Sequence, residues 1–252
     1  MNDLYAEALQ RMLVYFETLA NLIEKPKKVK IGDGYTYRYE SSSLHAAILQ
    51  KLSRVLTGIQ AVHLLNIHGF LQEQAALQRV LDELTEDISF LAYAIIFNDH
   101  TDLHERYLKA FYEEEYDDPS SAMESSQKRP MIPRKKIRAY VNKVENGGDQ
   151  STGIEAGRTI SKAYSGYVHG ASPHIMELYF GKPPKFHLRG SQDSPLYRDH
   201  IDDLLNYFYR GLLALACSAK SFGNDDMFNE IYSYSKDFAR RSGRSEQLTP
   251  YV

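Results

Sequence analysis

The feature that most constrains the fold is a long helical repeat of apolar residues between positions 70 and 97. Its members follow one another at alternating spacings of four and three residues, which places them on one face of an α-helix. A second helical pattern runs over 43–66, and only the break at His68-Gly69 separates the two. Helices of this length joined by so short a break are expected to pack as an antiparallel hairpin. The repeat consists of Leu77, Leu81, Leu84, Ile88, Leu91 and Ile95.

Most of the remaining chain has the same periodicity, divided by helix caps and helix breakers. Ser172-Pro173 and Ser194-Pro195 mark two helix starts, because serine caps a first turn and proline needs no amide hydrogen bond there. One segment differs: Gly32-Asp33-Gly34 separates two short runs, the second with alternating tyrosines, which predicts a β-hairpin near residues 28–40. Further helices are expected at 3–24, from 101 into the acidic run 113–118, after Pro133, up to His169, at 195–222 and from Asp225 onward.

Together these patterns predict an all-α protein, a multi-helix bundle of about eight helices with one small β-hairpin. We expect a single helical domain over residues 1–252, and a chain with 43% apolar residues can bury the core that it needs. The stretch 117–132 contains proline and serine but few large apolar side chains, so it is expected to form a mobile loop or linker.

Charge, cysteine content and hydropathy exclude several classes of protein. A net charge of −3 gives no overall basic field for non-specific nucleic-acid binding, although it leaves room for a local basic patch. The lone Cys217 excludes an intramolecular disulfide and a zinc site made of cysteines alone. The apolar runs are too short to span a bilayer and the first residues do not read as a signal peptide. A soluble, cytoplasmic protein without a membrane partner is therefore expected.

The sequence contains no recognisable motif for a metal or a cofactor. His100 and His104 have the spacing of the zinc-binding HExxH motif, but the glutamate is missing. His200 and Asp203 in RDHIDD are three residues apart and have no companion ligand. Neither GDGYTYR nor NGGDQSTG matches a phosphate-binding loop. We therefore expect no metal and no cofactor.

Arg79 and Glu83 form the first candidate for a functional site. Their four-residue spacing stacks them on one helix face, roughly opposite the leucine seam, and Glu86 continues the row toward Phe90 and Tyr93. The row can be a surface ion pair, a buried pair facing a second layer of helices, or a functional site. The surface pair is the commonest of these and contributes little to stability.

The second candidate is the stretch AYSGYVHG, in which Ser165 and His169 are four residues apart on one helix face. The negative end of the helix dipole favours the imidazolium form of His169, and Gly170 supplies the left-handed residue that ends the helix. His169 is expected either to bond a carbonyl or carboxylate and fix two helices, or to face a ligand as a catalytic residue. We predict that the helix ends where this imidazole meets the row of Arg79 and Glu83.

Two basic segments are candidates for contact with a polyanion such as RNA. Runs of this kind are more often a solvated surface, and both lie next to acidic or aromatic neighbours. The candidate residues are Lys27, Lys28 and Lys30 in the first segment, and Arg134, Lys135, Lys136 and Arg138 in the second.

The Arg-x-x-x-Glu of LQRVLDEL and the Ser-x-x-Val-His-Gly of YSGYVHG resemble motifs of a bacterial all-helical family of unknown function. That family is similar in turn to the HEPN superfamily of helical bundles, many of which are RNA-cleaving toxins or defence proteins. The resemblance covers roughly residues 45–222. It implies that Arg79, Glu83, Ser165 and His169 are the site residues.

The chain departs from HEPN ribonucleases in one respect. Those enzymes carry Arg-x(4–6)-His on one helix, and the pair acts on RNA without a metal. The spacing occurs here from Arg38 to His45, across the end of the hairpin and a helix cap. Arg158 and His169 share a predicted helix but lie about 16 Å apart along its axis, too far to hold one phosphate together.

Two functions follow as hypotheses. In the first, the chain is a helical scaffold or regulatory protein of a bacterial defence or toxin-type system, and Arg79, Glu83 and His169 form a buried polar network. In the second, it is a HEPN-like metal-independent ribonuclease or nucleotide-directed enzyme, with His169 as acid/base and Arg79 as a phosphate clamp oriented by Glu83. RNA, a nucleotide or a protein is the expected partner. The 19 tyrosines also make a homodimer an expectation.

Overall fold

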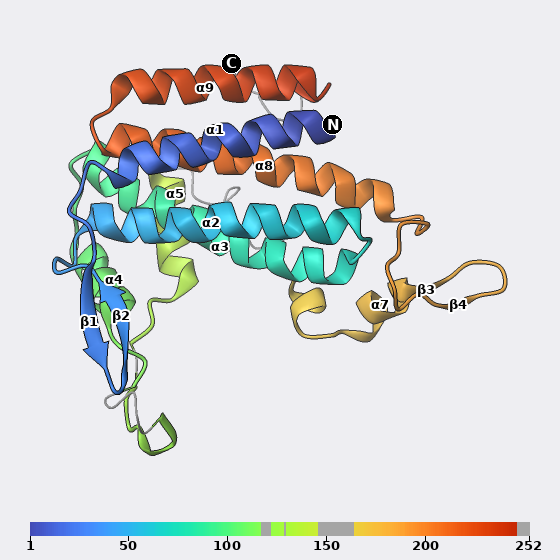
Figure 1. The fold of residues 1–252 in the computed structure, drawn as a ribbon, viewed down its shortest axis with the longest axis horizontal. Coiled ribbons are helices and arrows are strands. Elements are labelled where there is room, and N and C mark those ends of the chain that lie inside the picture. Colours follow the sequence, from blue (N-terminus) through green and yellow to red (C-terminus); the bar gives the residue numbers. More distant parts are fainter. Residues whose placement is uncertain (117–121, 129, 146–163, 246–252) are drawn as a thin grey trace.

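The structure is a computed structural model that describes residues 1–116, 122–128, 130–145 and 164–245. Long helices dominate it and lie side by side as a bundle (Figure 1). The predicted all-α fold is confirmed, and the long central helices end within a few residues of the expected positions. The helices are α1 (Asn2–Ala20), α2 (Leu44–Ile67), α3 (Leu71–Ile96), α4 (Asp102–Tyr112), α5 (Arg134–Glu145), α7 (Ser172–Ile175), α8 (Tyr197–Ser221) and α9 (Asp225–Arg241), with a further helical turn at 164–168 and short 3₁₀ segments at η1 (Ala122–Glu124) and η2 (Met176–Leu178).

Helices α2, α3 and α8 form the centre of the bundle, and each packs against the other two. Helix α9 packs on α8, α1 contacts α2, α8 and α9, and α5 packs on α3 (Figure 1). The seam predicted on α3 faces the core, since Leu81, Ile88 and Leu91 are at most 1% exposed. In the described part of the chain, no helix combines the length and the apolar character that crossing a membrane requires.

The predicted hairpin is present as β1 (Lys27–Ile31) paired with β2 (Gly34–Arg38) in antiparallel register. Most of its side chains are exposed, and it extends away from the bundle (Figure 1). Its end is anchored by Arg38, whose Nε and Nη2 donate to the two carboxylate oxygens of Glu114 at 2.7 and 3.0 Å. The hairpin is therefore an appendage of the bundle, and an exposed ion pair links its end to the residues after α4.

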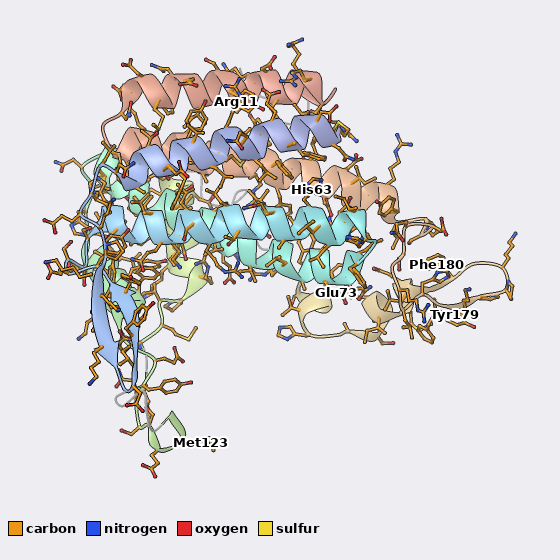
Figure 2. All side chains as sticks on the ribbon, in the orientation of Figure 1. Arg11, His63, Glu73, Met123, Tyr179 and Phe180 are labelled. Carbon is orange, nitrogen blue, oxygen red and sulfur yellow. The ribbon has the colours of Figure 1, made fainter. Side chains whose placement is uncertain are left out.

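The structure adds a second small hairpin, formed by β3 (Tyr179–Phe180) and β4 (Lys185–Phe186). Tyr179 and Phe180 lie on a loop that projects beside α7 (Figure 2). Each strand has two residues, so the segment is too short to show the alternation by which strands are recognised in a sequence.

Part of the loop or linker expected at 117–132 lies outside the described residues, namely 117–121 and 129. Within the remainder, η1 forms a single 3₁₀ turn, and the Met123 and Met131 side chains are 99% and 87% exposed. Figure 2 shows Met123 far from the bundle. The mobility of this segment stays a prediction.

Candidate functional site

The predicted pair on α3 is formed, with Arg79 Nη2 2.7 Å from Glu83 Oε1. The arginine side chain is 18% exposed and the glutamate side chain 40% exposed, so the pair lies at the surface of the bundle. The Nη1 atom of Arg79 is buried and has no hydrogen-bond partner among the described residues. An exposed pair one helical turn apart contributes at most about 1 kcal/mol to stability.

His169 does not belong to a buried network with this pair. The helical turn before it ends as predicted, with the His169 amide donating to Ser165 O at 3.1 Å and Gly170 at a φ of +62°. Ser165 is partly buried, but the His169 side chain is exposed, and within the described ranges no hydrogen bond or ion pair connects it to the α3 pair. The predicted buried Arg–Glu–His network is therefore wrong, because the imidazole at the helix end faces solvent.

The histidine that packs against this helical turn is His174 of α7. A β-carbon at Gly166 would lie 2.1 Å from His174 Cε1, so only glycine permits this approach. One tyrosine of the turn contacts the same histidine, since the Tyr167 and His174 ring centroids are 4.3 Å apart. Gly166 of YSGYVHG thus permits a close contact between helices, as the sequence suggested. The histidine in this contact is His174 and not His169.

Two of the four basic residues predicted on α5 are bonded to acids of α3. Arg138 Nε donates to Glu86 Oε1 at 2.7 Å, and Arg134 forms a second ion pair with the same carboxylate. The Arg134 and Arg138 side chains are 25% and 15% exposed. They are internal partners of α3 and not free phosphate contacts, contrary to the prediction. Lys135 and Lys136 are exposed.

Asp87 connects three helices. Its carboxylate is 4% exposed, accepts from Lys51 Nζ of α2 at 2.8 Å and forms an ion pair with Arg134 of α5. Asp82, one and a half turns earlier on α3, connects α3 to α8 in the same way. It accepts from Tyr207 Oη at 2.9 Å and from Arg210 Nη1 at 2.5 Å. Neither aspartate was predicted as a site residue from the sequence, although their positions beside the buried seam of α3 were the available signal.

A cavity of about 560 Å³ lies between the 164–168 turn, α7, η2 and α8. Burial raises the pKa of Asp203 and lowers the pKa of His200 in its wall. His200 and Asp203 are the pair noted in RDHIDD, three residues apart. Their spacing on one helix face was therefore visible in the sequence. The cavity wall also includes Tyr164, Tyr167, His174, Glu177, Asp199 and Tyr207.

His104, considered above as half of a metal motif, caps helix α4. Its Nδ1 accepts from the Thr101 amide at 3.1 Å, so the ring proton is on Nε2, which lies 3.2 Å from Phe90 O and donates to it. The ring is fully buried and stacks on Phe90 with centroids 4.0 Å apart. Burial lowers the pKa of His104 and keeps it neutral.

This histidine should make stability depend on pH. Its pKa is lower in the folded than in the unfolded chain, so below about pH 6.5 the unfolded state takes up more protons and the free energy of unfolding falls. Between pH 7.5 and 5.5 we expect His104 to account for a loss of up to about 1.4 kcal/mol. Urea unfolding of wild type and His104→Gln measures it, and the variant should show the smaller loss. An identical pH dependence in both proteins would contradict this role, since His63 and His200 titrate in both.

The only match to the HEPN spacing does not form a site. Arg38 is bonded to Glu114, while His45 Nε2 lies 3.1 Å from Ser221 O at the end of α8. Each side chain therefore has its own structural partner. Arg158 of the second spacing lies outside the described residues.

The described ranges contain no group of three or more His, Cys, Asp or Glu side chains placed to hold a metal ion. Comparisons with protein-family models, with curated proteins and with solved structures found no match. The resemblance to the bacterial all-helical family therefore stays a prediction.

Proposed function

We propose that the protein is a helical scaffold or regulatory protein that works by presenting a fixed bundle to a partner. The bacterial defence or toxin-type setting that the resemblance implies is part of this proposal. One observation carries it: three acidic side chains along α3 are bonded to basic or hydroxyl side chains of other helices. Asp82, Glu86 and Asp87 thereby connect α3 to α8, α5 and α2.

This arrangement favours a structural role for the charges of α3. A catalytic carboxylate or arginine has to be available to a substrate, whereas each of these groups is already matched by an opposite charge. Charged groups that are partly buried and bonded on several sides are expensive to separate, so such a network holds one arrangement of the helices. A scaffold requires this property.

A His169→Ala variant tests the proposal against catalysis. Because the side chain is exposed, we expect the free energy of unfolding to change by less than about 0.5 kcal/mol. We also expect neither wild type nor variant to cleave labelled single-stranded RNA in the presence of EDTA. Thermal unfolding and a gel assay give the two readouts.

The second candidate is a metal-independent ribonuclease, which the exposure of His169 favours because an acid/base imidazole must reach its substrate. Lys135 and Lys136 are exposed as well and could contact RNA. Cleavage by wild type that is lost in His169→Ala, with an unchanged melting temperature, would replace the scaffold by this function. His100→Ala is the matched control, because it removes another exposed histidine.

A further inference from the structure

The cavity beside α8 is lined by aromatic rings from separate segments. The Tyr164 and Tyr207 centroids are 6.4 Å apart with ring planes at 76°, and the Tyr167 and His174 centroids are 4.3 Å apart at 74°. Figure 1 shows α7 and the first turns of α8 at the same end of the bundle. An aromatic face that is open to the cavity attracts a cation, because the face is the negative part of the ring.

The same cavity carries an excess of negative charge. Asp203 accepts from Tyr164 Oη at 2.7 Å and Glu177 from Tyr167 Oη at 3.0 Å, which orients both carboxylates without neutralising them. Asp199 adds a third carboxylate at the wall. Arg210, the arginine that the described residues contribute to this wall, is already paired with an aspartate of α3. A phosphate would be repelled from this site, and a cation attracted.

A buried histidine in the wall points to a ligand independently of the charges. His200 is 5% exposed, and its Nδ1 is buried without a hydrogen-bond partner among the described residues. The backbone at this position is held firmly, since His200 O accepts from Gln74 Nε2 at 2.8 Å and Gln74 Oε1 accepts from Asn66. Burial lowers the pKa of the ring, so one nitrogen of the neutral imidazole is an acceptor for an N–H donor. Buried polar groups in proteins are normally bonded, and a ligand would supply the partner.

We propose that this cavity binds a small organic ammonium ion, of the size of a diamine or polyamine. The volume of about 560 Å³ falls within the range of small-molecule sites and far exceeds the needs of a bare metal ion. The ammonium group lies against the tyrosine rings and donates to Asp203 and Glu177, while its N–H groups reach the histidine wall. The proposal goes beyond the scaffold function and does not depend on it. Binding of an ammonium ion in this cavity requires neither a protein partner nor RNA cleavage.

Isothermal titration of the full chain with spermidine, in about 150 mM salt to suppress surface attraction, tests the site. We expect one spermidine per chain, and an affinity at least ten-fold lower in the double variant Asp203→Asn, Glu177→Gln. Both changes keep the side-chain shape and remove charge. Asp226→Asn, an exposed carboxylate at the start of α9, is the matched control and should leave the affinity unchanged.

Because Asp203 is partly buried, the unfolding of each variant without ligand is measured first. Asp199→Asn is a second variant at an exposed position, and we expect it to weaken spermidine by about three-fold without affecting the fold. Absence of binding to wild type would overturn the proposal. Equal affinity in wild type, the double variant and Asp199→Asn would overturn it too, because it would place spermidine elsewhere on the acidic surface.

Discussion

Replacing Asp87 by asparagine should lower the free energy of unfolding by about 3 kcal/mol, the usual effect of leaving partly buried ionic partners without their counter-ion. The carboxylate is 4% exposed and serves Lys51 and Arg134 together. Asparagine keeps the volume and removes the charge, so Lys51, 15% exposed, loses its carboxylate partner, and Arg134, 25% exposed, keeps only the carboxylate of Glu86. Urea unfolding at pH 7 measures the loss.

Glu83→Gln is the matched control, because it removes an ion-paired carboxylate of the same helix that is 40% exposed. Its expected effect is below about 0.5 kcal/mol. Adding Lys51→Met to Asp87→Asn should recover part of the stability, since the unmatched charge of Lys51 then disappears. Similar losses in Asp87→Asn and Glu83→Gln would show that the three-helix network contributes no more than a surface pair.

Replacing Phe90 by alanine should lower the free energy of unfolding by about 3–5 kcal/mol. The side chain is fully buried in α3, stacks on His104 and meets the Tyr140 ring edge-on at 5.2 Å. Its loss removes apolar contact and leaves a cavity under the cap of α4. Phe97→Ala is the control at the end of the same helix, where the ring is 58% exposed and the loss should stay below about 1 kcal/mol. Equal melting temperatures for the two variants would contradict this placement of the core.

The architecture was predictable because local patterns determine it. The spacing of Leu81, Ile88 and Leu91 defines the buried face of α3, and the glycines around Asp33 mark the first hairpin. Caps and breakers also placed the helix ends, although α8 begins at Tyr197, two residues beyond Pro195. Signals of this kind act within about one helical turn and do not depend on the tertiary fold.

The candidate site was only partly predictable, because its partners are distant in sequence. Asp82 looks like one more polar residue beside an apolar seam until Tyr207, 125 positions later, is placed against it. Arg134 and Arg138 look like a basic patch until α5 packs on α3. The ion pair between Arg79 and Glu83 was predictable because both residues are on one helix. The surroundings of His169 were not, because they depend on how two helices pack.

The two terminal helices lie side by side (Figure 1) and are joined directly to each other. Glu7 of α1 pairs with Arg241 of α9 at 2.7 Å, and Tyr15 donates to Glu230 at 2.6 Å, contacts that span 234 and 215 positions. The entropy of closing a loop grows with its length, so these contacts can form only after α2, α3 and α8 have brought both helices together. Assembly of the bundle should thus finish with α1 and α9, and local opening should begin there, uncovering one side of α8 while the centre stays folded.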